Sequence, residues 1–143
     1  MDKMDSAAGK ILVMDDDEMV RFIAGQTLEQ IGFTVIYAEE GCAAVDLYRK
    51  SIADNVPFTA VILDLNIPGG MGGLEALQKL LEIDPAVKAY VSSGNSADPA
   101  MINCRQHGFL GVIEKPYFYL SQELLDEFTQ AVSTASEHYR ETR

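Results

Sequence analysis

Short apolar runs alternate along the chain with longer segments that have helical spacing. The apolar runs are four or five residues long and lie at residues 11–14, 33–37, 60–63, 87–91 and 110–113. Between them, apolar positions recur every three or four residues, as in the stripe from Val20 to Ile31, which is typical of one face of a helix. The same spacing predicts a helix over Leu74–Ile83 and a last helix with a stripe from Leu120 to Ala135.

The apolar runs are continuous rather than alternating, which is typical of parallel strands covered on both faces. Gly32 and Gly108 follow helical segments, where a helix is expected to stop. We predict an α/β fold, a flavodoxin-like doubly wound five-stranded parallel sheet in the order 2-1-3-4-5 with five helices. It forms a single domain over residues 9–135, with a disordered N-terminal segment (1–8) and the end of the last helix or a linker at 136–143.

The composition is that of an acidic globular domain. Among 143 residues, 48% are hydrophobic, and 22 Asp and Glu stand against 11 Lys and Arg, a net charge of −11. Such a surface repels nucleic-acid phosphates, so we expect no direct contact with nucleic acid. The chain shows no membrane-length apolar run or signal peptide, and its two cysteines lie in no metal or redox motif, so we expect a cytoplasmic domain with reduced thiols and no membrane contact.

Polar and charged side chains stand where four of the predicted strands end. Asp15-Asp16-Asp17-Glu18 follow the first strand, Asp64 the third, Ser92-Ser93 the fourth and Lys115 the fifth. In doubly wound sheets the carboxyl ends of parallel strands share one edge, where ligands bind. The residues are far apart in sequence, so their meeting at one edge is more specific than a local motif.

These groups together suit phosphoryl chemistry with a metal ion. Carboxylates held close together repel one another, and Mg²⁺ prefers one or two carboxylates with waters and a phosphate. A carboxylate can attack a phosphoryl group and form an acyl phosphate. A metal, an ammonium group and a hydroxyl would neutralise the phosphoryl oxygens.

The sequence resembles the receiver domain of bacterial response regulators over about residues 9–135. The matching pieces are Ile11-Leu12-Val13-Met14-Asp15-Asp16, Leu63-Asp64-Leu65-Asn66-Ile67-Pro68, Ser93-Gly94 and Lys115-Pro116. The separations also match, with 29 residues from Asp64 to Ser93 and 22 from Ser93 to Lys115. Four motifs in order with the right spacing are a strong signal.

The resemblance assigns a role to each matched position. Asp64 would be the phosphoacceptor, and Lys115 and Ser93 would contact the phosphoryl group. Mg²⁺ (or Mn²⁺) would be held by Asp15, Asp16, Asp64 and the backbone carbonyl of Asn66. Ser92 competes with Ser93 for the hydroxyl role, and the spacing favours Ser93.

Two features depart from the usual family pattern. The loop after Pro68 reads Gly69-Gly70-Met71-Gly72-Gly73, and its four glycines suggest a freely moving loop that could affect access to Asp64. Val112 stands where the family often has an aromatic switch residue, with Tyr90 and Tyr117 as candidate substitutes. The glycine loop resembles receiver domains attached to hybrid sensor histidine kinases.

The resemblance implies a phosphoryl-accepting module of a two-component phosphorelay. Its partners would be a histidine kinase or phosphotransfer domain and a downstream protein, and the domain would be a monomer or weak dimer. We expect a fragment of a hybrid sensor histidine kinase that alone is no enzyme beyond self-catalysed phosphotransfer and autodephosphorylation. The alternatives are a stand-alone single-domain response regulator and an unphosphorylated pseudo-receiver. A phosphohydrolase would need an acid-base Asp where Asn66 stands.

Overall fold

A five-stranded parallel sheet forms the centre of the protein. The computed structural model describes residues 9–94 and 97–115, together with Asp126 and Gln130. The strands are β1 (Lys10–Met14), β2 (Thr34–Ala38), β3 (Ala60–Asp64), β4 (Ala89–Ser93) and β5 (Gly111–Glu114). Their order in the sheet is β2-β1-β3-β4-β5, and every pair is parallel. The predicted flavodoxin-like sheet is therefore confirmed.

Five helices are present in the described residues. They are α1 (Glu18–Gln30), α2 (Gly41–Ala53), α3 (Gly73–Ile83), α4 (Pro99–Ile102) and α5 (Cys104–His107). The short helices α4 and α5 share the segment between β4 and β5, where sequence analysis expected one helix. The predicted last helix, the N-terminal segment 1–8 and the C-terminal segment 136–143 lie outside the described residues, apart from Asp126 and Gln130, which are both helical.

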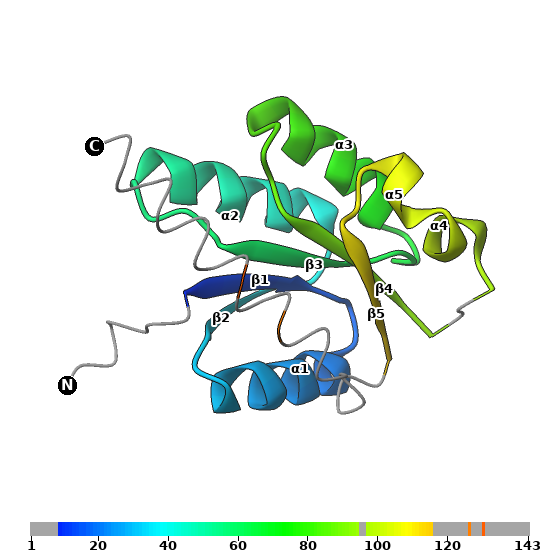
Figure 1. Cartoon of the computed structure of the whole chain (residues 1–143), viewed down its shortest axis with the longest axis horizontal. Coiled ribbons are helices and arrows are strands. Elements are labelled where there is room, and N and C mark those ends of the chain that lie inside the picture. Colours follow the sequence, from blue (N-terminus) through cyan, green and yellow to red (C-terminus); the bar gives the residue numbers. More distant parts are fainter. Residues whose placement is uncertain (1–8, 95–96, 116–125, 127–129, 131–143) are drawn as a thin grey trace.

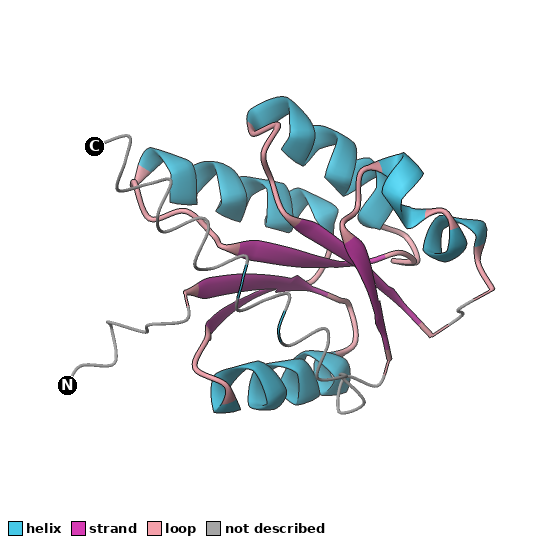
Figure 2. Ribbon diagram, viewed as in Figure 1, coloured by secondary structure: helices cyan, strands magenta, loops and turns pink. Residues whose placement is uncertain are grey.

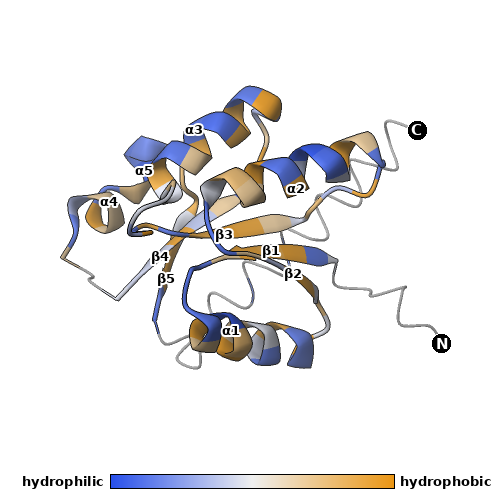
Figure 3. Cartoon of the chain, turned by 180° about the vertical axis from the view of Figure 1, so that it is seen from behind, coloured by the Kyte–Doolittle hydropathy of each residue, from blue (hydrophilic) through white to orange (hydrophobic). Residues whose placement is uncertain are grey.

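Helices cover both faces of the sheet, as Figures 1 and 2 show. On one face, Ala24 and Leu28 of α1 pack with Ile11, Val13 and other strand residues. On the other face, α2 and α3 pack over alternate positions of the same strands, and α4 and α5 join this second cluster. In Figure 3 the central strands β1 and β3 are mostly orange, whereas the helices carry bands of both colours. Successive strand residues thus enter two different cores, which explains the continuous apolar runs.

Two glycines end helices as the sequence predicts. Gly32 follows α1 with a φ of 104°, and Gly108 follows α5 with a φ of 109°. This left-handed backbone conformation favours glycine because a β-carbon would clash there. The glycines turn the chain directly into β2 and β5, so they help to set where these strands begin.

Two further predictions concern membranes and thiols. Within the described part of the chain, no helix combines the length and apolarity that crossing a bilayer requires. Both cysteines are free thiols; Cys104 is buried in the core beside α3, and Cys42 is exposed at the start of α2.

Candidate functional site

The site lies at the carboxyl edge of the sheet, where β1, β3 and β5 end. Asp15 follows β1, Asp64 is the last residue of β3, and Lys115 follows β5. Met14 and Leu63 are register partners in adjacent strands, so the residues after them are neighbours. The sheet topology thus brings together three predicted residues that are up to 100 positions apart in the chain.

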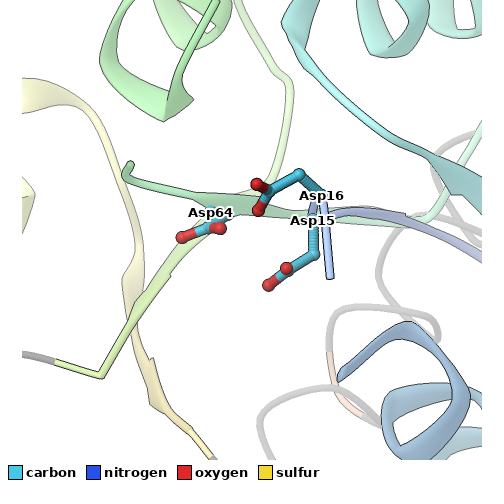
Figure 4. Close-up of side chains that lie close together, drawn as sticks. All are labelled: Asp15, Asp16 and Asp64. Atoms are coloured by element: carbon cyan, nitrogen blue, oxygen red, sulfur yellow. The ribbon is translucent and has the colours of Figure 1, made fainter. Parts of the chain in front are cut away.

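Three carboxylates converge at this edge. Asp15, Asp16 and Asp64 each offer an oxygen, and these oxygens all lie within 4.8 Å of one another. Figure 4 shows the three side chains gathered at the ends of β1 and β3. Asp15 and Asp64 are buried, whereas Asp16 is exposed. The cluster therefore has two fixed, desolvated members and one member open to solvent.

Lys115 pairs with both buried carboxylates. Its Nζ lies 2.8 Å from Oδ2 of Asp15 and 3.2 Å from Oδ2 of Asp64. Burial by itself lowers the Lys115 pKa, but the charges of Asp15 and Asp64 outweigh burial and raise the pKa above its usual 10.5. The lysine therefore stays protonated at neutral pH and can place a positive charge beside Asp64.

Asp64 is held in an environment that opposes its ionisation. Burial, and then the negative charge of Asp15, raise its pKa from 3.8 to about 6, although Lys115 and the N–H of Asn66 act in the other direction. The Asn66 N–H donates to Oδ1 of Asp64 at 3.3 Å. At neutral pH the carboxylate is ionised at an energetic cost, which a further cation nearby would reduce.

Asp15 has an oxygen that the described residues do not fully satisfy. Its Oδ1 accepts a hydrogen bond from the N–H of Asp17 at 2.9 Å. Its Oδ2 is buried and lies close to the Lys115 ammonium, but this ion pair lacks hydrogen-bond geometry and no other described residue donates to the atom. A buried carboxylate oxygen normally has a donor or a metal as its partner. All the converging side-chain ligands are oxygens, as Mg²⁺ prefers, so the residues fit such an ion.

The two serines at the end of β4 are both buried but lie differently. Ser92 is the register partner of Asp64, so the pleat directs the two side chains to the same face of the sheet. Ser93 is the register partner of Glu114, and its carbonyl accepts from the Lys115 N–H at 3.4 Å. Register thus favours Ser92 and spacing favours Ser93, and the role of Ser93 stays a prediction.

The glycine loop is more closely packed than its composition suggests. A β-carbon at Gly72 would lie 2.5 Å from the carbonyl oxygen of Leu65, and one at Gly73 would lie 2.8 Å from that of Asp64. These two glycines let the loop pass directly against the backbone that leaves β3. Gly72 and Gly73 thus have no room for a side chain, whereas Gly69, with a φ of +76°, has open space around it. The motion of the loop stays a prediction.

The usual aromatic switch position is filled by an aliphatic residue in contact with the core. Val112 is half-buried and packs against the cluster beneath α2 and α3. Tyr90 is buried in the other cluster, on the face of the sheet that α1 covers. It therefore does not replace an aromatic side chain at position 112. The other candidate, Tyr117, lies outside the described residues, as does Pro116.

Arg21 is a residue of the site that the sequence pattern did not predict. This half-buried residue of α1 donates from Nη1 to the carbonyl oxygen of Asp15 at 2.7 Å. Long side chains on a helix point back toward its N-terminus. Since Asp17 caps α1 at that end, a basic residue in the first turn was a signal that it could reach the acidic segment.

Comparisons with known proteins agree with this geometry. A family model described as the response regulator receiver domain matches residues 11–128. Chemotaxis protein CheY of Bacillus subtilis (strain 168) is 30% identical over 111 residues, covering 77% of this chain and 88% of that protein. A response regulator receiver protein of Anaeromyxobacter sp. (strain Fw109-5) is 34% identical over 107 residues, and this chain spans 42% of its length.

A solved structure shares the fold. The CheX-CheY-BeF3-Mg²⁺ complex from Borrelia burgdorferi matches with a TM-score of 0.71 and 23% identity, covering 87% of this chain and 88% of that one. The order of the strands and the acidic cluster at the sheet edge fit these relationships. This chain is a member of the response regulator receiver domain family, the receiver module of two-component signalling.

Proposed function

We propose that Asp64 accepts a phosphoryl group from a phosphohistidine of a histidine kinase or phosphotransfer domain. The observation that carries the proposal is the placement of Asp64, with the Lys115 Nζ 3.2 Å away and oxygens of Asp15 and Asp16 within 4.8 Å. An Asp64 carboxylate oxygen attacks phosphorus, the phosphorus–nitrogen bond breaks, and the electron pair leaves with the histidine imidazole. The product is an acyl phosphate on Asp64.

The surrounding groups would stabilise the charge that moves in this step. Lys115 already holds its proton beside Asp64 and would pair with a phosphoryl oxygen. Mg²⁺ (or Mn²⁺) would be held by Asp15, Asp16, Asp64 and the backbone carbonyl of Asn66, and when bound it supplies positive charge to the transferring oxygens. The similar Borrelia protein was crystallised with BeF3 and Mg²⁺, which supports this assignment.

Intact mass spectrometry tests the phosphoacceptor directly. The protein is incubated with acetyl phosphate, with and without Mg²⁺, beside Asp64→Asn. We expect one Mg²⁺-dependent phosphoryl adduct that is missing from the variant. If no adduct forms, the same samples are titrated with beryllofluoride, because a rapidly hydrolysed acyl phosphate would escape detection. Absence of both the adduct and Mg²⁺-dependent beryllofluoride binding would favour an unphosphorylated pseudo-receiver.

The choice between the two serines has a matched test. The spacing match assigns Ser93 to the phosphoryl group, whereas register places Ser92 beside Asp64. We expect Ser93→Ala to slow phosphorylation of Asp64 by acetyl phosphate more than Ser92→Ala does. The reverse order would transfer the role to Ser92. Thermal melting of both variants controls for loss of packing, since both serines are buried.

We further infer the setting in which the domain works. The net charge of −11 supports protein partners rather than nucleic acid, and we propose a cytoplasmic monomer or weak dimer with a downstream protein partner. The Gly69–Gly73 loop supports an origin in a hybrid sensor histidine kinase, with a stand-alone response regulator as the alternative. Faster transfer from a kinase dimer than from a histidine phosphotransfer domain would support the hybrid origin, and the opposite preference would support the alternative.

A further inference from the structure

Arg21 binds the backbone on both sides of Asp16. Its Nη1 donates to the carbonyl oxygen of Asp15 at 2.7 Å. Its own backbone N–H donates to the carbonyl oxygen of Asp17 at 3.1 Å. The Arg21 side chain thus holds the carbonyl before Asp16, and a backbone bond of the first turn of α1 holds the carbonyl after it.

Asp16 depends on this backbone for its position. Its side chain is exposed and makes no hydrogen bond or ion pair with the part of the chain that the structure describes. Nevertheless one of its oxygens lies within 4.8 Å of oxygens of Asp15 and Asp64, which carry the same charge. Like charges at this distance repel. The conformation of the main chain, rather than a side-chain contact, must keep the Asp16 carboxylate in the cluster.

The flanking residues have their own anchors, and the Arg21 side chain adds a link between them beside the hydrogen bond from the Asp17 N–H to Oδ1 of Asp15. The Asp15 N–H donates to the carbonyl of Ala38 at 3.0 Å and so continues the ladder between β1 and β2. The Asp17 side chain caps α1 by accepting from the N–H groups of Met19 and Val20. Asp15 thus belongs to the sheet and Asp17 to the helix. The Arg21 side chain joins the sheet end to the helix across Asp16.

We propose that Arg21 is a positioning residue that holds Asp16 where it can share a divalent cation with Asp15 and Asp64. This inference rests on the proposed function, because it gives Arg21 a role through cation binding. Groups that orient a metal ligand change the affinity for the metal ion although they do not contact the ion themselves. Arg21 suits this position since its guanidinium donates to a backbone carbonyl in a fixed plane, whereas an ammonium group is a compact donor with less geometric control.

Cation binding gives the direct test. Mn²⁺ is titrated into the protein, and free Mn²⁺ is measured by its electron paramagnetic resonance signal. We expect Arg21→Met to weaken binding by about tenfold, the lower end for loss of a group that orients a metal ligand. Arg21→Lys can still donate to the carbonyl but with less geometric control, so it should recover only part of that loss. The matched control is Arg49→Met, which removes an equal charge from an arginine that is 61% exposed on α2.

A thermodynamic cycle separates positioning from general destabilisation. If Arg21 acts through Asp16, Arg21→Met should add little to the loss already caused by Asp16→Asn, because the two changes affect one ligand. Thermal melting in EDTA checks that each protein is folded at the assay temperature. Should Arg21→Met melt too early, Arg21→Gln replaces it, since glutamine is a good helix former with a shorter side chain.

Each outcome has a distinct meaning. If wild-type protein binds no Mn²⁺ and forms no phosphoryl adduct, the proposed function itself fails. If wild-type protein binds Mn²⁺ and Arg21→Met binds it equally well, the positioning role is overturned while the proposed function stands. Additive losses from Arg21→Met and Asp16→Asn would also overturn the role, because Arg21 would then act by another route.

Discussion

Replacing Asp64 with asparagine should stabilise the fold at neutral pH. In the folded chain, burial and the charge of Asp15 raise the Asp64 pKa from 3.8 to about 6. Between these two values the folded state keeps a proton that the unfolded state has lost. The free energy of unfolding therefore falls as pH rises through this window, and the penalty is fully present above pH 6. Asparagine carries no charge and avoids the penalty.

The size of the effect follows from the shift. A change of about two pKa units at about 1.4 kcal/mol each gives an upper limit of about 3 kcal/mol. The side chain is 4% exposed, so solvent screening reduces this value little. However, asparagine also removes one of the two carboxylates that pair with Lys115. We therefore expect a net gain of about 1–2 kcal/mol at pH 7.5, or roughly 3–8 °C in Tm.

Urea unfolding followed by circular dichroism tests this reasoning, with EDTA present, at pH 4.5 and 7.5. Asp64→Asn should be more stable than wild type at pH 7.5, and the difference should shrink at pH 4.5. Lys115, with a pKa raised above 10.5, stays charged throughout and contributes no pH dependence in this range. Asp46→Asn, at a side chain that is 78% exposed, controls for the loss of one negative charge. A gain that is independent of pH, or a loss at pH 7.5, would refute the argument.

Three further predictions concern the cation, the loop and a hydrogen bond outside the site. Mg²⁺ at ten times its Kd should stabilise the wild type by about 1.4 kcal/mol in thermal melts but leave the stability of Asp64→Asn nearly unchanged. Equal shifts in the two proteins would contradict a cation site that includes Asp64. Gly72→Ala should lower the free energy of unfolding in urea by more than about 2 kcal/mol, because its β-carbon would lie 2.5 Å from a carbonyl oxygen. Gly69→Ala should lower it by about 1 kcal/mol, because of its positive φ. Equal losses would show that the close approach at Gly72 has no effect of its own. Tyr48→Phe should cost about 1.5 kcal/mol, since it removes a 2.7 Å hydrogen bond to Asp84, and a neutral result in the same assay would show that the bond contributes nothing net.

The sheet could be predicted because its strands are buried on both faces. All five residues of β3 are buried, and the four before Asp64 read as an uninterrupted apolar run. The strand bounds were less predictable. β4 was expected at 87–91 but runs over Ala89–Ser93, because its last two residues are polar and yet remain paired with β3 and β5. Hydropathy could not show where the backbone ladder ends.

The acidic side chains and the lysine could be predicted because each stands within two residues of the end of an apolar run. Asp15, Asp64 and Lys115 needed only the rule that parallel strands end at one edge. Arg21 was not predictable in this way, since its partner is a backbone carbonyl and depends on where α1 begins. The close packing of Gly72 was not predictable either. The glycine-rich composition of its loop suggests a flexible backbone, whereas the contacts of Gly72 require the absence of a side chain.

The charges of the site connect its stability with its chemistry. Three carboxylates and one ammonium group leave two negative charges uncompensated, and two of the carboxylates are buried. The fold therefore carries an electrostatic cost at neutral pH, which the raised pKa of Asp64 reflects. A divalent cation would bring the net charge of these four groups to zero and so should stabilise the domain. Both Asp64→Asn without Mg²⁺ and Mg²⁺ in the wild type should thus raise the stability of the domain for the same reason, which is the excess negative charge of the site. The substitution removes one negative charge, whereas the cation adds two positive charges.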